Sequence, residues 1–240
     1  MSDAKPDAIS DKPRCHALVP CAGVGQRAGT AGPKQYEMLA GRTVVAHTLA
    51  ALAAVPRLRS ILVVLSPEDD VFERHTPTFR GRSVRVGGAT RAATVSAGLQ
   101  VLRESGVRDH DWVLVHDAAR CLLQPAWVER LIDACIEDEV GGLLALPLAD
   151  TLKAVDAHGR VAATLDRGAK WLAQTPQMFR LGLLQRALRA ADAARVAVTD
   201  ESSAVEALGH APRLVQGDIE NLKLTWPADF VLAARLLETR

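Results

Sequence analysis

A glycine-rich loop near the start of the chain holds the residues whose types and spacing are best suited to bind a ligand or take part in a reaction. It spans residues 19–36 and reads VPCAGVGQRAGTAGPKQY. Gly23 and Gly25 can adopt positive φ, which lets the backbone approach a ligand, and successive N–H groups in such a turn bind anions. Arg27 and Lys34 lie seven positions apart in the same loop. Two cations beside such a turn suit a nucleoside triphosphate, where they would stabilise the charge that develops as a phosphoryl bond changes.

Two other phosphate-binding loops do not fit this stretch. A dinucleotide fingerprint, G-x-G-x-x-G, opens directly into a helix, whereas Gly29, Gly32 and Pro33 would break a helix here. The chain also lacks an acidic residue after its second predicted strand, where it reads LSP. The P-loop requires G-x-x-x-x-G-K-[ST], but Gln35 follows Lys34. These differences argue against a dinucleotide-dependent oxidoreductase. The alternative to a phosphate-binding role for Arg27 and Lys34 is that both are ordinary loop charges exposed to solvent.

Strand and helix patterns alternate along the chain and place this loop after the first strand. Compact apolar runs such as ILVVL, residues 61–65, are typical of strands that helices cover on both faces. The alternation predicts an α/β fold with a Rossmann-like, mostly parallel sheet, right-handed crossovers and helices on both faces. Strands are predicted at 15–20, 61–65, 83–86, 112–115, 142–146 and 213–215, and helices at 43–55, 90–103, after Pro125, at 181–194 and from Pro227.

Polar residues in two further segments would lie at the carboxyl edge of this sheet, where ligands of open α/β sheets bind. Asp117 follows a buried strand in the segment HDAAR, so its carboxylate could accept a hydrogen bond from a hydroxyl or lie near a metal ion. The alternative is a structural role, in which Asp117 caps a helix or pairs with Arg120. The Gly87-Gly88 pair precedes a helix for which Thr90 is a suitable cap. Such a turn brings backbone close to a ligand, although an ordinary strand-to-helix connection has the same pattern.

The alternation breaks between residues 150 and 170. Two short β-like runs there flank the polar turn DAHG, a pattern typical of a hairpin. A hairpin inserted into an α/β domain projects from it as an arm that either clasps a second subunit or covers the surface of a monomer, and the sequence alone does not favour one of these. We therefore predict a disordered tail at 1–13 and one domain at 14–240 that carries this β-arm.

The composition restricts the class of protein. The chain has 240 residues, of which 48% are hydrophobic and 24% charged, with a formal net charge of +1. These values are ordinary for one large globular domain and predict no affinity for nucleic acid or membranes. The polar start of the chain lacks the apolar core of a signal peptide. The four cysteines form no C-x-x-C pair, which indicates reduced thiols in a cytoplasmic protein rather than a zinc site.

A set of segments along the chain resembles one enzyme family. The first loop, extended to VPCAGVGQRAGTAGPKQYEMLAGRTVVAHTL, resembles the nucleotide-binding loop of nucleotidyltransferases with its G-x-G-x-R…P-K pattern. The segments GGATRAATVSAGL, WVLVHDAAR, DTLK, LDR, QTPQMF, TDESSAVE and NLKLT then resemble, in the same order, those of the 2-C-methyl-D-erythritol 4-phosphate cytidylyltransferase family. The resemblance runs from about His16 to the last helix. It implies a nucleotidyltransferase domain of the nucleotide-diphospho-sugar transferase type at 14–240.

The resemblance also implies a reaction and its residues. A cytidylyl group would pass from CTP to 2-C-methyl-D-erythritol 4-phosphate, giving 4-diphosphocytidyl-2-C-methyl-D-erythritol and pyrophosphate in non-mevalonate isoprenoid biosynthesis. Mg²⁺ would be held mainly by the CTP phosphates, with Asp117 as a candidate contact. Thr151 and Arg167 would extend from the arm into the active site of a partner subunit, which makes the expected assembly a homodimer. The implied catalytic residues are Arg27, Lys34, Arg167 and Lys223; the CTP-binding residues are Pro20, Cys21, Ala22, Gly23, Gly25, Gln26, Gly88, Arg91, Thr94 and Ala118; and the acceptor-binding residues are Asp117, Arg120, Thr151, Arg167, Thr199 and Lys223.

Several positions depart from the family pattern. Ala89 stands where the family has an acidic residue and Cys121 where it has proline, while Cys21 replaces alanine and Gln26 a basic residue. We expect Gln26 to lower the affinity for CTP modestly and Cys21 to act through its backbone. His116 is predicted to be structural rather than catalytic. A cytidylyltransferase for another polyol phosphate, such as ribitol 5-phosphate, and a non-catalytic nucleotide-binding regulator are the alternatives; the presence of all four catalytic cations argues against the regulator.

Overall fold

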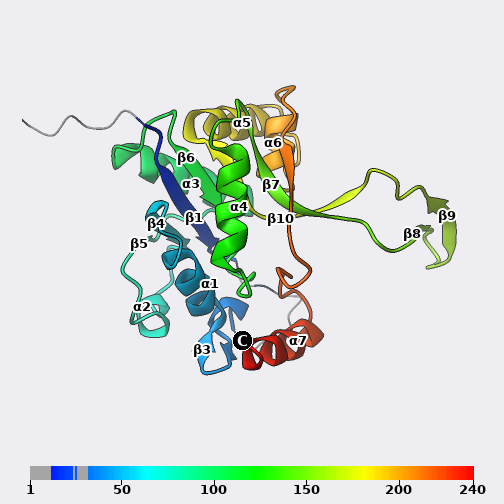
Figure 1. Ribbon diagram of the computed structural model, residues 1–240, viewed down its shortest axis with the longest axis horizontal. Coiled ribbons are helices and arrows are strands. Elements are labelled where there is room, and N and C mark those ends of the chain that lie inside the picture. Colours follow the sequence, from blue (N-terminus) through cyan, green and yellow to red (C-terminus); the bar gives the residue numbers. More distant parts are fainter. Residues whose placement is uncertain (1–11, 24, 26–31) are drawn as a thin grey trace, which may run out of the picture.

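Figure 1 shows the computed structural model, in which one sheet forms the centre of the molecule. The structure describes residues 12–23, 25 and 32–240, so most of the predicted tail, together with Gln26 and Arg27, lies outside the described residues. The sheet has seven strands in the order β11-β7-β10-β6-β1-β4-β5. Their bounds are β1 (Cys15–Cys21), β4 (Leu58–Leu65), β5 (Arg82–Val84), β6 (Trp112–Val115), β7 (Gly141–Pro147), β10 (Trp171–Arg180) and β11 (Arg213–Gln216).

The strand pairing is mostly parallel. β5, β4, β1 and β6 pair in parallel, as do β7 and β11. Strand β10 runs antiparallel to both of its neighbours, β6 and β7, so the other six strands share one direction. Their carboxyl ends therefore meet at one edge of the sheet. This arrangement confirms the predicted α/β fold with a mostly parallel sheet.

Helices cover both faces of the sheet. Successive residues of a strand point to opposite faces, so each central strand contributes to two apolar clusters. Val19 of β1 packs in the cluster that includes α1 (Val44–Ala53) and α4 (Pro125–Cys135). Leu18 packs in the cluster that includes α3 (Arg91–Glu104) and α5 (Leu181–Ala193). The last helix, α7 (Pro227–Glu238), packs against the start of α1 through Ala233.

Several elements were not predicted. Four of them are very short, and β10 carries polar residues and a proline, which do not follow the pattern of a buried strand. The pairing of β10 with β7 is interrupted between Ala173 and Gln177, where the side chains of Gln174, Thr175 and Gln177 are buried and hydrogen-bonded. The short elements are β2 (Met38–Leu39), β3 (Arg42–Thr43), α2 (Phe72–His75) and α6 (Glu201–Glu206), besides a 3₁₀ turn, η2 (Lys34–Tyr36).

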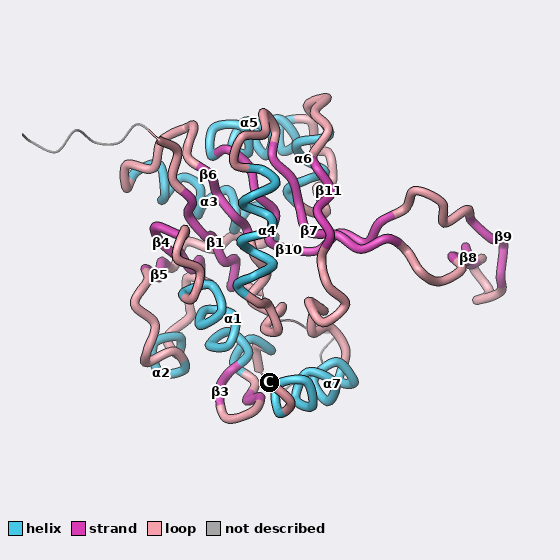
Figure 2. The backbone as a smooth tube through the Cα atoms, in the orientation of Figure 1, coloured by secondary structure: helices cyan, strands magenta, loops and turns pink. Residues whose placement is uncertain are grey.

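The predicted hairpin is present and projects far from the sheet. Strands β8 (Leu152–Val155) and β9 (Val161–Leu165) pair antiparallel, and every residue of β9 is exposed. Figures 1 and 2 show this arm extending well beyond the rest of the molecule before the chain returns as β10. The projecting β-arm of the predicted fold is thus confirmed.

The four cysteines lie in the interior as free thiols. Burial raises the pKa of Cys15 to about 11 and that of Cys121 and Cys135 to about 12, so these thiols stay protonated. Among the helices that the structure describes, none combines the length and apolar character needed to cross a membrane.

Candidate active site

A pocket of about 250 Å³ opens at the carboxyl edge of the sheet, beside the ends of β1 and β6. Four parts of the chain meet there: the loop after β1, the turn before α3, the residues after β6 and the segment around Lys223. Most residues predicted to bind CTP, and three others predicted for the reaction, line this one pocket. They are Pro20, Cys21, Ala22, Gly23, Gly25, Gly88, Arg91, Thr94 and Ala118, with Lys34, Asp117 and Lys223.

Lys34 connects the glycine-rich loop to the opposite wall of the pocket. Gly25 has a φ of +68°, and a Cβ at this position would lie 2.7 Å from the side-chain carbons of Lys34. Only glycine therefore allows the lysine to lie against the loop. The Lys34 Nζ donates to the backbone oxygen of Leu224 at 2.5 Å, next to Lys223. Two lysines from opposite ends of the sequence are thereby placed in one pocket.

The turn before α3 presents a helix amino end to the pocket. Thr90 caps the helix as predicted, because its hydroxyl accepts from the Ala93 N–H at 3.1 Å. The Thr94 hydroxyl accepts from the Gly88 N–H at 3.1 Å, which closes the turn. A Cβ at Gly88 would approach the Ala93 Cβ to 2.6 Å, so glycine is required for this packing. Helix amino ends attract anions, so the turn suits a phosphate or a base carbonyl.

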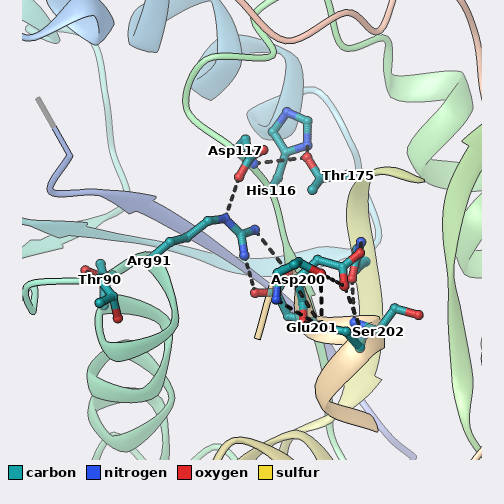
Figure 3. Close-up of polar contacts among 12 residues, drawn as sticks. Thr90, Arg91, His116, Asp117, Thr175, Asp200, Glu201 and Ser202 are labelled. Carbon is teal, nitrogen blue, oxygen red and sulfur yellow. Dashed lines mark hydrogen bonds and ion pairs between the residues drawn. The ribbon is translucent and has the colours of Figure 1, made fainter. Parts of the chain in front are cut away.

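Asp117 lines the pocket and contacts several cations, of which Figure 3 shows Arg91. Its carboxylate lies 2.8 Å from the Arg91 Nε, 2.9 Å from the Lys223 Nζ and 3.8 Å from the Arg120 Nε. Burial alone would raise the pKa of Asp117, but Arg91, Lys223 and Arg120 outweigh it and hold the pKa well below its usual range. Asp117 is therefore a permanent anion that fixes the positions of three cations.

Arg91 is held on its other side by Glu201, a residue that the sequence analysis did not identify. The Glu201 carboxylate at the start of α6 accepts from both terminal nitrogens of Arg91, at 2.6 and 3.0 Å. Asp200 caps α6 by accepting from the Ser203 N–H at 2.9 Å, which orients the helix start. Burial disfavours the charge of Arg91, but Glu201 and Asp117 together raise its pKa above the usual range. Figure 3 shows Arg91 lying between these two carboxylates.

A neutral histidine holds the backbone of Asp117. His116 is fully buried, and burial lowers its pKa to about 4. Its Nε2 lies 3.2 Å from the Arg120 backbone oxygen, which can only accept, so Nε2 donates and Nδ1 accepts from the Thr175 hydroxyl at 3.0 Å. The same hydroxyl oxygen accepts from the Asp117 N–H at 3.1 Å (Figure 3). His116 thus has both nitrogens engaged within the protein, which agrees with the structural role predicted for it.

With this geometry in place, comparison with known proteins decides the family. The family model described as 2-C-methyl-D-erythritol 4-phosphate cytidylyltransferase matches residues 15–239. The chain belongs to this family. A Laribacter hongkongensis protein named 2-C-methyl-D-erythritol 4-phosphate cytidylyltransferase is 56% identical over 227 residues, which cover 93% of this chain and 96% of that protein. A crystal structure of 4-diphosphocytidyl-2C-methyl-D-erythritol synthase superposes with a TM-score of 0.84 at 42% identity, covering 94% of this chain and 99% of that one.

Some members of the cytidylyltransferase family are longer. A bifunctional enzyme IspD/IspF of Albidiferax ferrireducens is 59% identical over 229 residues, which are 95% of this chain but 54% of that protein. The chain thus spans about half the length of this relative and 96% of the length of the Laribacter protein. Family membership confirms the predicted enzyme class, a nucleotidyltransferase, and does not favour the ribitol 5-phosphate or non-catalytic alternatives.

Arg120, which the family resemblance assigns to the acceptor, lies behind the pocket rather than in its lining. Its side chain is 12% exposed, and one terminal nitrogen donates to the Asn221 backbone oxygen at 2.6 Å. The side-chain amide of Asn221 in turn donates to the Thr175 backbone oxygen at 2.8 Å. Arg120 therefore connects Asp117 to the segment that carries Lys223. Asn221 was not identified from the sequence, because an asparagine in a loop carries no distinguishing pattern.

Three other predicted acceptor residues of this cytidylyltransferase-family chain lie outside the pocket of their own subunit. Thr151 and Arg167 are exposed on the arm, where Arg167 donates to the Ala149 backbone oxygen. Thr199 is exposed just before α6, and its hydroxyl donates to the Ser203 hydroxyl at 3.3 Å. One chain thus gathers the predicted nucleotide-binding residues that the structure describes, all but Gln26, and does not gather these three acceptor residues.

Proposed function

We propose that the pocket binds CTP and that the phosphate of 2-C-methyl-D-erythritol 4-phosphate attacks its α-phosphorus. A bond forms between an acceptor phosphate oxygen and the α-phosphorus, while the bond from that phosphorus to the β-phosphate oxygen breaks. The products are 4-diphosphocytidyl-2-C-methyl-D-erythritol and pyrophosphate. The observation that carries the proposal is the convergence of Lys34, Lys223 and Arg91 on a glycine-rich loop and a helix amino end.

The reaction requires cations and alignment rather than a strong base. The acceptor phosphate is already an anion at neutral pH, so bringing it to a triphosphate is opposed mainly by charge repulsion. The pocket supplies positive charge for this purpose, and His116, which precedes Asp117, is neutral and has both ring nitrogens hydrogen-bonded within the protein. Lys34 acts on the phosphates of CTP, with Arg27 from the same loop. Lys223, held at 2.9 Å from Asp117, orients the acceptor phosphate.

Mg²⁺ is proposed to enter with CTP. Among the residues that the structure describes, no group of histidine, cysteine, aspartate and glutamate side chains could hold a metal ion. The two oxygens of Asp117 lie against Arg91 and Lys223, which does not favour this carboxylate as a ligand. The CTP phosphates would therefore hold the ion, which partly neutralises their charge when bound.

The arm is proposed to complete the active site of a second subunit. Its large apolar side chains are exposed in the single chain, with Val155 at 69% and Val161 at 65%. A two-stranded ribbon with exposed apolar residues gains stability when another surface covers it. In a two-fold symmetric dimer each arm would reach the partner's pocket and bring Thr151 and Arg167 to its acceptor. We also propose a cytoplasmic location, which the four free thiols support.

Subunit mixing tests this arrangement. Lys34→Ala and Arg167→Ala should each impair the homodimer, but co-expression should restore activity. In the mixed dimer, one site has Lys34 from its own subunit and Arg167 from its partner's arm. The matched control co-expresses Lys34→Ala with Lys223→Ala, which leaves no intact site because both lysines belong to the same pocket. If the first mixture recovers no more activity than the control, the arm does not serve the partner subunit.

The acceptor is tested by pyrophosphate release. Wild-type protein is incubated with CTP and either 2-C-methyl-D-erythritol 4-phosphate or ribitol 5-phosphate, and the initial rates are compared. We expect release with the first acceptor and a far lower rate with the second. Faster release with ribitol 5-phosphate would reverse the assignment. Tight CTP binding without release for either acceptor would indicate a nucleotide-binding regulator.

A further inference from the structure

A larger hollow, of about 770 Å³, lies at the opposite edge of the sheet, where β1, β4 and β5 begin. The end of α3 and the loop before β6 complete its wall. Four segments that are distant in sequence, 14–16, 59–62, 80–82 and 101–111, line it, and the proposed reaction uses none of them. Its arginines are Arg14, Arg59, Arg80, Arg82 and Arg108.

Four of these arginines form no ion pair with any carboxylate that the structure describes. Arg108 pairs with Asp111 at 3.0 Å, and that carboxylate also accepts the N–H groups of Arg14 and Arg108. Within residues 12–23, 25 and 32–240, no carboxylate forms an ion pair with the side chains of the other four arginines; Arg82 donates to the Ser105 hydroxyl at 2.6 Å. Like charges gathered around one hollow repel each other, and a bound anion would relieve that repulsion.

The neighbouring arginine at this edge shows the contrast. Arg57 precedes β4 by one residue and pairs with both Glu129 and Asp133. The fold therefore neutralises an arginine on the α4 side of the strand, whereas four of the five arginines around the hollow have no carboxylate partner among the described residues.

A buried histidine lining the hollow has an unused nitrogen. His16 of β1 is 6% exposed, and its Nδ1 lies 2.8 Å from the hydroxyl of Ser60, its neighbour on β4. Its Nε2 is buried and has no hydrogen-bond partner among the described residues. When Ser60 donates to Nδ1, the neutral ring carries its proton at Nε2 and offers a donor to an anion. An unsatisfied buried donor costs stability, so a ligand oxygen at this position would be stabilising.

We propose that this hollow is a second anion site, which binds a small molecule with at least two phosphate groups. One guanidinium group can bind two oxygens of a phosphate at once. Four guanidinium groups therefore match a diphosphate or triphosphate better than a single phosphate. The volume lies within the range of small-molecule pockets, about 300–1,000 Å³, and exceeds what inorganic phosphate fills. Ile61 and Leu62 form part of its wall, and a hollow of this limited volume suits a small ligand better than a nucleic acid strand.

The test is calorimetric titration of the full chain with inorganic pyrophosphate, with inorganic phosphate and a short single-stranded oligonucleotide as comparison probes. We expect pyrophosphate to bind wild-type protein at two sites, one in the catalytic pocket and one in the hollow. Arg59→Gln/Arg80→Gln should weaken the second by about 10²-fold, since each lost charge-assisted contact accounts for roughly tenfold. His16→Asn, which retains a partner for Ser60 but lacks Nε2, should weaken the same site by about tenfold.

A charge-matched control separates a built site from general attraction. Arg186→Gln/Arg235→Gln removes the same charge from two exposed helix positions and should leave both binding events unchanged. Thermal unfolding of each variant would verify folding, and CTP turnover should persist in all of them because none of these residues lines the catalytic pocket. A single binding event that ignores Arg59 and Arg80, an equal loss in both double variants, or binding of the oligonucleotide without pyrophosphate would each overturn the proposal.

Discussion

Replacing Glu201 with glutamine should destabilise the fold measurably, because this carboxylate is the buried anchor of Arg91. The Glu201 side chain is 1% exposed and accepts from Arg91 at 2.6 and 3.0 Å. Glutamine retains one acceptor oxygen but loses the charge and the second acceptor. Arg91 would keep its contact with Asp117 at 2.8 Å, so no buried charge is left alone. One hydrogen bond to a charged group contributes about 1.5–3 kcal/mol, so we expect Glu201→Gln to cost about 2–3 kcal/mol of unfolding free energy.

Urea denaturation measures this loss against a matched control. Glu129→Gln makes the same chemical change in an exposed pair, where Arg57 is 37% exposed and retains Asp133. Exposed pairs contribute about 0–1 kcal/mol, so the control should shift the denaturation midpoint little. Glu201→Gln should lower the midpoint clearly while leaving the dependence on urea unchanged. Equally small shifts in both variants would refute the idea that the buried pair stabilises the pocket.

Three further expectations concern catalysis and pH. Lys34→Ala should lower turnover by about 10²-fold or more, as loss of a preorganised donor does, with Lys12→Ala as a control that retains activity; wild-type turnover in Lys34→Ala would exclude its role. Arg167→Ala should raise KM for the acceptor phosphate and leave KM for CTP unchanged. Initial rates measured with each substrate varied in turn test this, and an equal rise in both KM values would contradict it. His116 has a pKa of about 4 when folded and an ordinary value of 6.5, so the unfolded state binds more protons between these values. Stability should therefore fall as pH decreases through that window, by about 1.4 kcal/mol per unit, and His116→Gln should flatten the fall; an unchanged pH profile would contradict the neutral buried state.

The strands of the sheet could be predicted because their apolar runs are continuous. The run WVLV at β6 is fully buried, and its predicted bounds match those observed. Strand β10 could not be predicted in this way, because Gln174, Thr175 and Gln177 are polar and buried, and their stability depends on partners elsewhere in the chain. Burial of polar groups is decided by tertiary hydrogen bonds, which a local pattern does not contain.

The same reasoning separates the site residues that sequence patterns identified from those that they missed. Gly25 and Thr90 follow from local rules of turn and cap chemistry, and each has the predicted conformation or contact. The contact between Arg91 and Glu201 joins residues 110 positions apart, so neither residue indicates the other in the sequence. Likewise, the surface that we propose covers the arm belongs to a second subunit, whose placement does not follow from the pattern of one hairpin.

The most direct test of the proposed reaction follows the acceptor oxygen. 2-C-Methyl-D-erythritol 4-phosphate labelled with ¹⁸O in its phosphate is incubated with CTP and the wild-type protein, and the products are analysed by mass spectrometry and ³¹P NMR. Attack by that phosphate on the α-phosphorus predicts ¹⁸O in the bridge between the two phosphorus atoms of the nucleotide product and none in the pyrophosphate. An unlabelled bridge, or ¹⁸O in the pyrophosphate, would contradict cytidylyl transfer by this route.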